Sequence, residues 1–288
     1  MDTPISIILF GSGRSGTTWV ENIINFKDDY RILFEPFYPK KVKQVNSFLP
    51  RQYMSPNEKY EKKDIIISNI IRGNIRSSWI DQMNKPGIYT KRIIKDIRIN
   101  LMINHIHKQH PKIPILFLIR NPCAVANSRI ELNWNTHLDE ILKQRKLFED
   151  YLYDFKIAIK NVNLYGNNFE KQIMLWCIEN YLPIVQFKNN GILILRYEEI
   201  CIEYEKTVNR MFNYLGIRYS PIVEEESSRP SQMTQRYSEI DSNENKIIRW
   251  RKNITKDDIK KAKEILELFN MNNLFTDDLN YPIHNYDF

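Results

Sequence analysis

The stretch Phe10–Trp19, FGSGRSGTTW, determines how the rest of the chain is interpreted. It continues a short apolar run, Ile5–Phe10, and a helical pattern opens at Thr17, so a buried strand is expected to pass through a glycine-rich turn into a helix. Glycines allow a backbone to wrap around an anion, and the amides at the start of a helix point towards it. The stretch therefore predicts a phosphate-binding loop.

This loop lacks the lysine that ATP- and GTP-binding loops carry after their second glycine. Gly16 is followed by Thr17 and Thr18, and Arg14 supplies the only cation in the loop. A γ-phosphoryl group with magnesium is usually met by that lysine and by an acidic metal ligand. The loop instead fits a single 5′-phosphate whose attached group contacts one cation, as in adenosine 3′-phosphate 5′-phosphosulfate. Ser15 and the two threonines add hydroxyl donors that a turn without a ligand would not need.

Five apolar or β-branched runs have the character of buried parallel strands. They are Ile5–Phe10, Arg31–Phe34, Arg92–Lys95, Ile115–Ile119 and Ile192–Leu195. Helical patterns between and after them cover Thr17–Phe26, Ile99–His110, Ala124–Leu132, much of 138–187, Tyr204–Leu215 and a last helix opening at Thr255. This alternation predicts one α/β domain, residues 1–288, with a P-loop-type parallel sheet of about five strands flanked by helices.

Composition limits the class of partner. The chain has 288 residues and a formal charge of +7, which favours anionic partners. No dense Lys/Arg run interleaved with aromatic residues occurs, so nucleic-acid binding is not expected. The three cysteines are too few and too scattered for a disulfide framework or a zinc site, and His105, His107 and His110 have no acidic ligand beside them, so no metal is expected.

No stretch of the sequence approaches the length of a transmembrane helix. The short apolar run near the N-terminus is interpreted as a strand and not as a signal sequence. A cytoplasmic protein is therefore the expectation, and no sequence feature indicates the oligomeric state.

Residues 11–20, GSGRSGTTWV, resemble the 5′-phosphosulfate loop of the sulfotransferases that use adenosine 3′-phosphate 5′-phosphosulfate (PAPS). The Arg-Ser-Gly-Thr-Thr form is closer to the carbohydrate and tyrosylprotein enzymes than to the cytosolic steroid and phenol enzymes, which carry lysine there. The family's second signature is an arginine that ends a later strand, followed by a serine on the next helix. Residues 116–129, LFLIRNPCAVANSR, contain Arg120 and Ser128 in these places, and the resemblance implies that both hold the 3′-phosphate.

Glu35, in LFEPF (33–37), is the candidate general base. It ends the second predicted strand, where a carboxylate can face the ligand crevice and accept the proton of an attacking hydroxyl. The carbohydrate enzymes have a similar Glu-Pro after the loop. The cytosolic enzymes use a histidine in a Lys-Thr-His run, but IIKDIR (93–98) has Ile97 in the histidine's place, which strengthens Glu35 and leaves Asp96 as the second choice. Lys95 matches the family lysine and is a candidate for neutralising the sulfuryl oxygens.

Five further side chains are candidates for a place near the nucleotide. Arg14 is the candidate for stabilising charge on the departing bridging oxygen. Tyr197 matches a position where the family often has Tyr-Glu; nucleotide contact and packing of the strand end remain open for it. Trp19 is expected mainly in the core, with adenine stacking as the alternative. Of the C-terminal cations, Arg251 is preferred and Lys252 is second for the 3′-phosphate.

The segment 218–252 is expected to form a loop or lid over the nucleotide. It is polar and long, which is typical of a functional or disordered loop. Its pieces RPSQMT (229–234) and IIRWRKNI (247–254) resemble family segments that fold over the nucleotide.

Together these features predict an enzyme that transfers a sulfuryl group from PAPS to an acceptor hydroxyl, in line and without a metal. Arg-Ser-Gly-Thr-Thr and Glu-Pro favour a saccharide acceptor, and a lipid, peptide or small metabolite remains open. Two alternatives also remain: a nucleoside or small-molecule kinase with a degenerate loop, and a non-catalytic module that binds adenosine 3′,5′-bisphosphate.

The lysine-less loop leads to a ligand prediction. Adenosine 3′,5′-bisphosphate should raise the melting temperature of the protein far more than ATP with magnesium does, because the loop fits one 5′-phosphate and Arg120 and Ser128 meet the 3′-phosphate. Thermal denaturation with each nucleotide at equal concentration measures this. Equal or greater stabilisation by ATP with magnesium would favour the kinase alternative.

Overall fold

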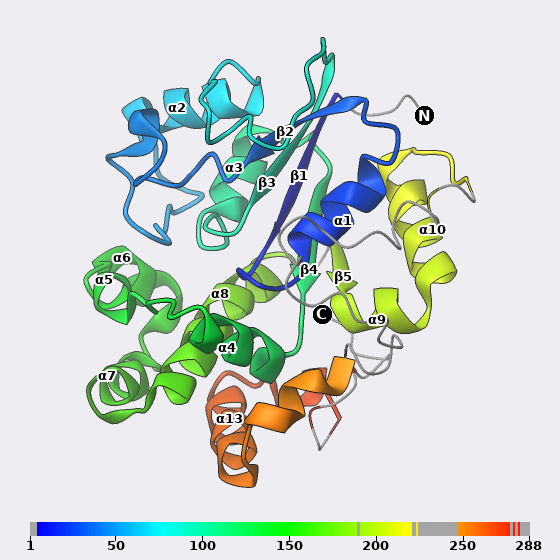
Figure 1. Cartoon of the computed structure of the whole chain (residues 1–288). Coiled ribbons are helices and arrows are strands. Elements are labelled where there is room, and N and C mark those ends of the chain that lie inside the picture. The colour runs from blue at the N-terminus through cyan, green and yellow to red at the C-terminus, as the bar shows by residue number, and fades with distance from the viewer. Residues whose placement is uncertain are drawn as a thin grey trace.

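Parallel strands form the centre of the structure (Figure 1). The computed structural model describes residues 5–188, 191–220, 223, 247–276, 279 and 282. Its strands are β1 (Ser6–Gly11), β2 (Tyr30–Phe34), β3 (Lys91–Asp96), β4 (Ile115–Ile119) and β5 (Leu193–Arg196). They form a five-stranded sheet in the order β2-β3-β1-β4-β5, and each neighbouring pair is parallel. The predicted α/β class, with a parallel sheet flanked by helices, is confirmed.

Each strand begins and ends within one residue of its predicted bounds. All residues of β1, β2 and β4 are buried, which is why these strands appear in the sequence as continuous apolar runs and not as alternating patterns. The central position of β1 places the glycine-rich loop that follows it in the middle of the sheet edge.

Helices cover both faces of the sheet (Figure 1). The α-helices are α1 (Thr17–Ile24), α2 (Glu61–Ile71), α3 (Ile103–Gln109), α4 (Pro122–Glu131), α5 (Leu138–Leu142), α6 (Arg145–Leu147), α7 (Lys156–Tyr165), α8 (Asn168–Gln186), α9 (Tyr197–Ile202), α10 (Tyr204–Leu215) and α13 (Lys256–Leu268). Shorter turns are the 3-10 helices η1 (Lys43–Val45), η4 (Arg249–Asn253) and η5 (Asn272–Leu274) and the π-helical turn η2 (Phe148–Leu152).

One face of the sheet packs against α1, α9 and α10. Its strand residues include Ile7, Leu9 and Leu116, and the helices contribute Val20 and Phe212, all buried. The predicted amphipathic helix Tyr204–Leu215 is confirmed with the same bounds as α10.

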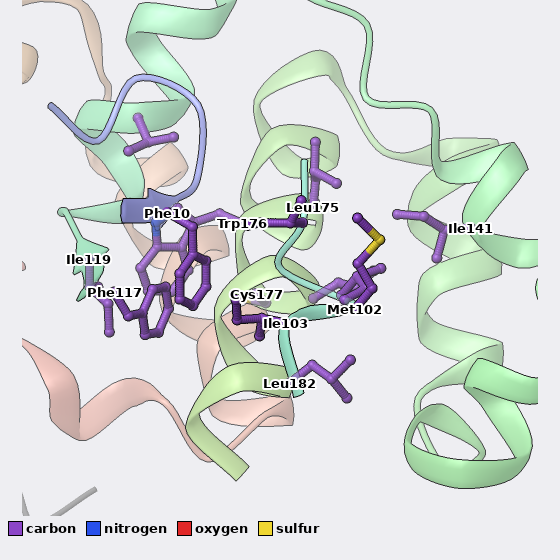
Figure 2. Close-up of a cluster of buried hydrophobic side chains, with 14 of the residues drawn as sticks. Phe10, Met102, Ile103, Phe117, Ile119, Ile141, Leu175, Trp176, Cys177 and Leu182 are labelled. Atoms are coloured by element: carbon purple, nitrogen blue, oxygen red, sulfur yellow. The ribbon is translucent and has the colours of Figure 1, made fainter. Parts of the chain in front are cut away.

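The other face carries the larger core, formed with α3, α4 and α8 (Figure 2). Phe10 and Phe117, on the adjacent strands β1 and β4, stack with ring centroids 4.6 Å apart and nearly parallel planes. Figure 2 shows Trp176 of α8 beside this pair. Stacking of this kind contributes about 0.5–1.5 kcal/mol beyond the burial of the rings. The core therefore fixes β1, and with it the start of the loop, against α8.

Three helices differ from the prediction. α2 was not predicted, because its apolar residues are mostly consecutive in EKKDIIISNII and show no clear helical spacing. α9 was not predicted either, because it begins directly at the end of β5. The helix expected at Ile99–His110 begins only at Ile103.

The last helix begins as predicted. Thr255 and Asp258 form a capping box at the start of α13, and Ala262, Ile265 and Leu266 are its buried residues. No helix in the described parts of the chain combines the length and apolar character that a membrane span requires.

Candidate functional site

The candidate site lies at the carboxyl edge of the sheet. In the β1–β3 register Phe10 pairs with Asp96, and in the β2–β3 register Phe34 pairs with Lys95. The glycine-rich loop after β1, Glu35 after β2 and the end of β3 therefore meet at one edge, where α/β sheets bind their ligands.

The loop has the backbone of an anion site. Gly16 has φ +96°, and a Cβ there would lie 2.7 Å from the ring of Tyr197, so no other residue fits without displacing that ring. Ser15 N donates to Ser12 O at 3.0 Å, which closes the turn. Helix α1 follows with no side-chain cap and no acidic residue in its first turn. Its first amides can therefore face an anion.

Two arginines and a serine converge beside the loop. Arg120 Nη1 donates to the carbonyl oxygen of Arg14 at 3.1 Å, and Arg14 Nε donates to Ser128 Oγ at 2.9 Å. Burial lowers the pKa of Arg14, and the neighbouring charge of Arg120 lowers it further. Neither arginine forms an ion pair with a carboxylate in the described part of the chain. The predicted residues of the 5′ and 3′ signatures are thus brought together, with Arg14 contacting Ser128.

Unpartnered polar atoms at this point fit a phosphorylated ligand. Ser15 Oγ and Arg120 Nε are buried and have no hydrogen-bond partner among the described residues. Buried polar atoms nearly always have partners in a complete structure, and charge-assisted contacts with a phosphate are strong. A 5′-phosphate in the loop could satisfy Ser15 Oγ, and a 3′-phosphate beside Arg120 could satisfy its Nε.

Tyr197, at the start of α9, packs against this cluster. Its ring lies 4.2 Å from the guanidinium carbon of Arg120 and contacts the position of Gly16. Trp19, on α1, meets the same ring edge-on at 5.5 Å between centroids. The aromatic pair therefore packs beside Arg120 and the loop, and nucleotide contact by either residue stays a prediction.

Glu35 is buried between two cations. Its Oε2 accepts from Arg98 Nη1 at 2.6 Å, and its Oε1 lies 3.5 Å from Lys95 Nζ. Its φ is +43°, an uncommon conformation for a residue with a side chain, and Glu35 N donates to Lys95 O at 2.7 Å to hold the turn. Arg98 was not singled out in the sequence, because only the fold shows that it turns back towards Glu35.

Asp96 has a different environment. Its two carboxylate oxygens accept from the backbone amides of Phe37 and Arg98, both at 2.8 Å. The side chain is fully buried, and this burial raises the pKa of Asp96 to about 6. Asp96 therefore holds the chain segments that flank Glu35 and Lys95.

A further carboxyl group, Glu21 on α1, was not predicted. It is buried, and burial raises its pKa to about 7, although the charge of Lys95 acts in the opposite direction. Its position in a helix that otherwise looks like core gave no signal in the sequence. Lys95 itself is buried, with Nζ 4.0 Å above the ring of Phe34.

The C-terminal cations are only partly described. Arg251 and Lys252 belong to η4, which packs against α4, and Asn253 Nδ2 donates to Glu131 Oε1 at 3.1 Å. Arg251 lies over the ring of Trp250, and Lys252 is exposed. Most of the expected lid 218–252, with Arg229 and Ser231, lies outside the described residues. Within the described ranges, no cluster of three metal-ligating side chains occurs.

Comparison with known proteins gives the same family as the sequence motifs. The family model described as Sulfotransfer_1, sulfotransferase domain, matches residues 4–274. The structure is similar to the sulfotransferase domain from the Synechococcus PCC 7002 olefin synthase, at 14% identity over 92% of this chain and 95% of that chain, with TM-score 0.51. It is also similar to the sulfotransferase domain from the curacin biosynthetic pathway, at 10% identity over 93% and 99%, with TM-score 0.52. At such identities the likeness shows the fold. No curated protein matches the sequence.

The arginine cluster yields a test by substitution. Arg120→Ala should weaken the binding of adenosine 3′,5′-bisphosphate strongly and that of 5′-AMP little, because only the first nucleotide carries a 3′-phosphate. A charge-assisted contact of this kind contributes about 1.5–3 kcal/mol. Isothermal titration calorimetry with both nucleotides measures the difference, and an equal loss for both would mean that Arg120 acts through the loop backbone instead.

Proposed function

The chain belongs to the sulfotransferase family, and from this premise we propose that it moves a sulfuryl group from PAPS to an acceptor hydroxyl with Glu35 as the general base. The observation that carries the proposal is the joint position of an anion-binding cluster and a buried carboxylate at one sheet edge. Arg14, Arg120 and Ser128 form the cluster, and Glu35 lies beyond Lys95 on the neighbouring strands.

In this proposal the loop and the arginine cluster bind the donor. The amides and hydroxyls of Ser15, Gly16, Thr17 and Thr18 hold the 5′-phosphate. Arg120 and Ser128 meet the 3′-phosphate, with Arg251 and Lys252 as further cations. The donor, when bound, supplies a sulfuryl group on a good leaving phosphate.

Arg14 and Lys95 are proposed to stabilise developing charge. Arg14 Nε donates to Ser128, so its remaining N–H groups are the ones assigned to the departing bridging oxygen. Lys95 Nζ is assigned to the sulfuryl oxygens. Its burial keeps water away from that contact, which strengthens the electrostatic interaction.

Glu35 is preferred to Asp96 as the base because of what each carboxylate already binds. Asp96 uses both oxygens for backbone amides, whereas Glu35 is oriented by the side chains of Arg98 and Lys95. Glu35 also retains slight exposure whereas Asp96 is fully buried, so the Glu35 carboxylate is the more accessible of the two to an acceptor hydroxyl.

The acceptor is proposed from the loop and from the residues that follow β2. The Arg-Ser-Gly-Thr-Thr loop and Glu-Pro favour a saccharide hydroxyl. A non-catalytic module that binds adenosine 3′,5′-bisphosphate would use the same arginine cluster, but it would have no need for a carboxylate held at 2.6 Å by an arginine beside the loop.

The general-base assignment predicts the behaviour of Glu35→Gln. This variant keeps the size of the side chain but removes the proton acceptor, so turnover should fall by about 10²–10⁴. Donor affinity should change little, because Glu35 makes no proposed contact with the phosphates. Steady-state kinetics together with calorimetry of donor-product binding measures both quantities.

Asp96→Asn is the matched variant, since Asp96 is the neighbouring buried carboxylate. It should lower the melting temperature because an amide nitrogen replaces one of the two oxygens and cannot accept its backbone hydrogen bond, while the folded fraction keeps turnover. If Glu35→Gln keeps normal turnover and Asp96→Asn is folded, binds donor product and is inactive, the base is Asp96. If both variants remain fully active, the proton takes another route.

A further inference from the structure

A buried ion pair lies directly behind the phosphate loop. Arg129, on α4, is the residue after Ser128, and its side chain is fully buried. Its Nη2 donates to Glu179 Oε2 on α8 at 2.7 Å, and its Nε donates to the carbonyl oxygen of Gly13 at 3.1 Å. One guanidinium group therefore joins the loop to α8.

The next residue of α8 makes a second contact with the loop. Asn180 Nδ2 donates to Ser12 Oγ at 3.0 Å and to Trp176 O at 2.6 Å. Ser12 and Gly13, two consecutive residues of the loop, thus each accept a hydrogen bond. Ser12 accepts from Asn180 of α8, and Gly13 accepts from Arg129, which is paired with Glu179 of α8.

Glu179 has a second cationic partner, Arg51, which hydrogen-bonds its other carboxylate oxygen. Burial raises the pKa of Glu179, but the charges of Arg129 and Arg51 more than offset this and hold it below its usual range. Glu179 is therefore a carboxylate at neutral pH. A buried ion pair generally gains little stability over apolar residues of similar volume, because both charges must leave water. Its presence here calls for a reason other than stability.

The backbone of the loop supplies that reason. Arg14 has φ +77°, an uncommon conformation for a residue with a side chain, and the peptide before it carries the carbonyl oxygen that Arg129 binds. The C=O and N–H groups of a trans peptide point in opposite directions. Binding the Gly13 carbonyl from behind therefore directs the amide of Arg14 away from α8, and keeps a carbonyl oxygen from facing an anion in the loop.

We propose that Arg129, fixed by Glu179, is a positioning residue that sets the peptide between Gly13 and Arg14 so that the loop can bind the 5′-phosphate of the donor. This role rests on the proposed donor site, and Arg129 supports that site without contacting the ligand. It differs from the assignment of Arg120, which concerns the 3′-phosphate.

Arg129→Lys tests this role. Lysine keeps the charge opposite Glu179, but its single nitrogen cannot contact both Glu179 and Gly13 with the geometry of a guanidinium. Calorimetry should show the dissociation constants of adenosine 3′,5′-bisphosphate and of 5′-AMP rising by the same factor, about tenfold, as expected for the loss of one hydrogen bond and of the backbone position it fixes. Both nucleotides are affected because both carry the 5′-phosphate.

Asp81→Asn is the matched control. Asp81 forms an ion pair with the buried Arg31 at 2.7 Å, and Arg31 also donates to Gly73 O, so these contacts include no residue of the loop. This variant should lower the melting temperature and leave both dissociation constants unchanged. The same unchanged constants in Arg129→Lys, with only a lower melting temperature, would make Arg129 structural and overturn the proposal. A loss for adenosine 3′,5′-bisphosphate alone would also overturn it, since it would place Arg129 on the 3′ side.

If Arg129→Lys does not fold, Asn180→Leu provides the second test. Leucine has a similar volume and removes the contact with Ser12, so both constants should rise together by a few-fold. Unchanged dissociation constants for both nucleotides in this variant would contradict the proposal that α8 positions the loop. A wild-type chain that binds neither nucleotide would contradict the proposed function itself, before any variant is compared.

Discussion

Two guanidinium groups are held together at the carboxyl edge of the sheet, where Arg120 donates to the backbone of Arg14 and Arg14 donates to Ser128. Like charges in a partly buried place repel each other, and an anion between them removes that cost. The rest of the site follows from this constraint. The loop follows the central strand β1, and the N-terminus of α1 has no side-chain cap, so its amides can face the ligand. The ring of Tyr197 packs against the guanidinium of Arg120. A fold that brings these groups together is suited to a phosphorylated ligand.

The proposed base, Glu35, is separated from the strand that carries the loop by one strand, β3. Lys95 and Glu35 lie at the ends of β3 and β2, and Asp96 holds the adjoining backbone through two amides. A general base must be close to the donor but must not repel it, and the two cations beside Glu35 offset its charge. The buried Glu21, with its pKa raised to about 7 by burial, carries less negative charge at neutral pH than an ordinary glutamate. The arrangement is therefore compatible with an anionic donor next to a carboxylate base.

The strands and the donor loop could be predicted from sequence because their signals are local. Buried parallel strands are continuous apolar runs, and the loop is a contiguous motif, so both were placed within a residue. Helix α2 was missed because its isoleucines are consecutive, and α9 because no turn separates it from β5. Arg98, Arg129 and Glu179 were missed for another reason: their contacts join residues far apart in the chain, as between Arg129 and Gly13. The spacing of residues along the sequence does not indicate such long-range contacts.

The central claim is that this sheet edge transfers a sulfuryl group and does not only bind a nucleotide. Incubating the protein with PAPS labelled in its sulfuryl group, and with a panel of saccharide, lipid, peptide and phenol hydroxyls, measures this most directly. The account predicts that label appears on an acceptor hydroxyl and that adenosine 3′,5′-bisphosphate forms in equal amount. Tight binding of the donor with no transfer to any acceptor class, under conditions where the bound nucleotide exchanges freely, would contradict it and would favour a binding module.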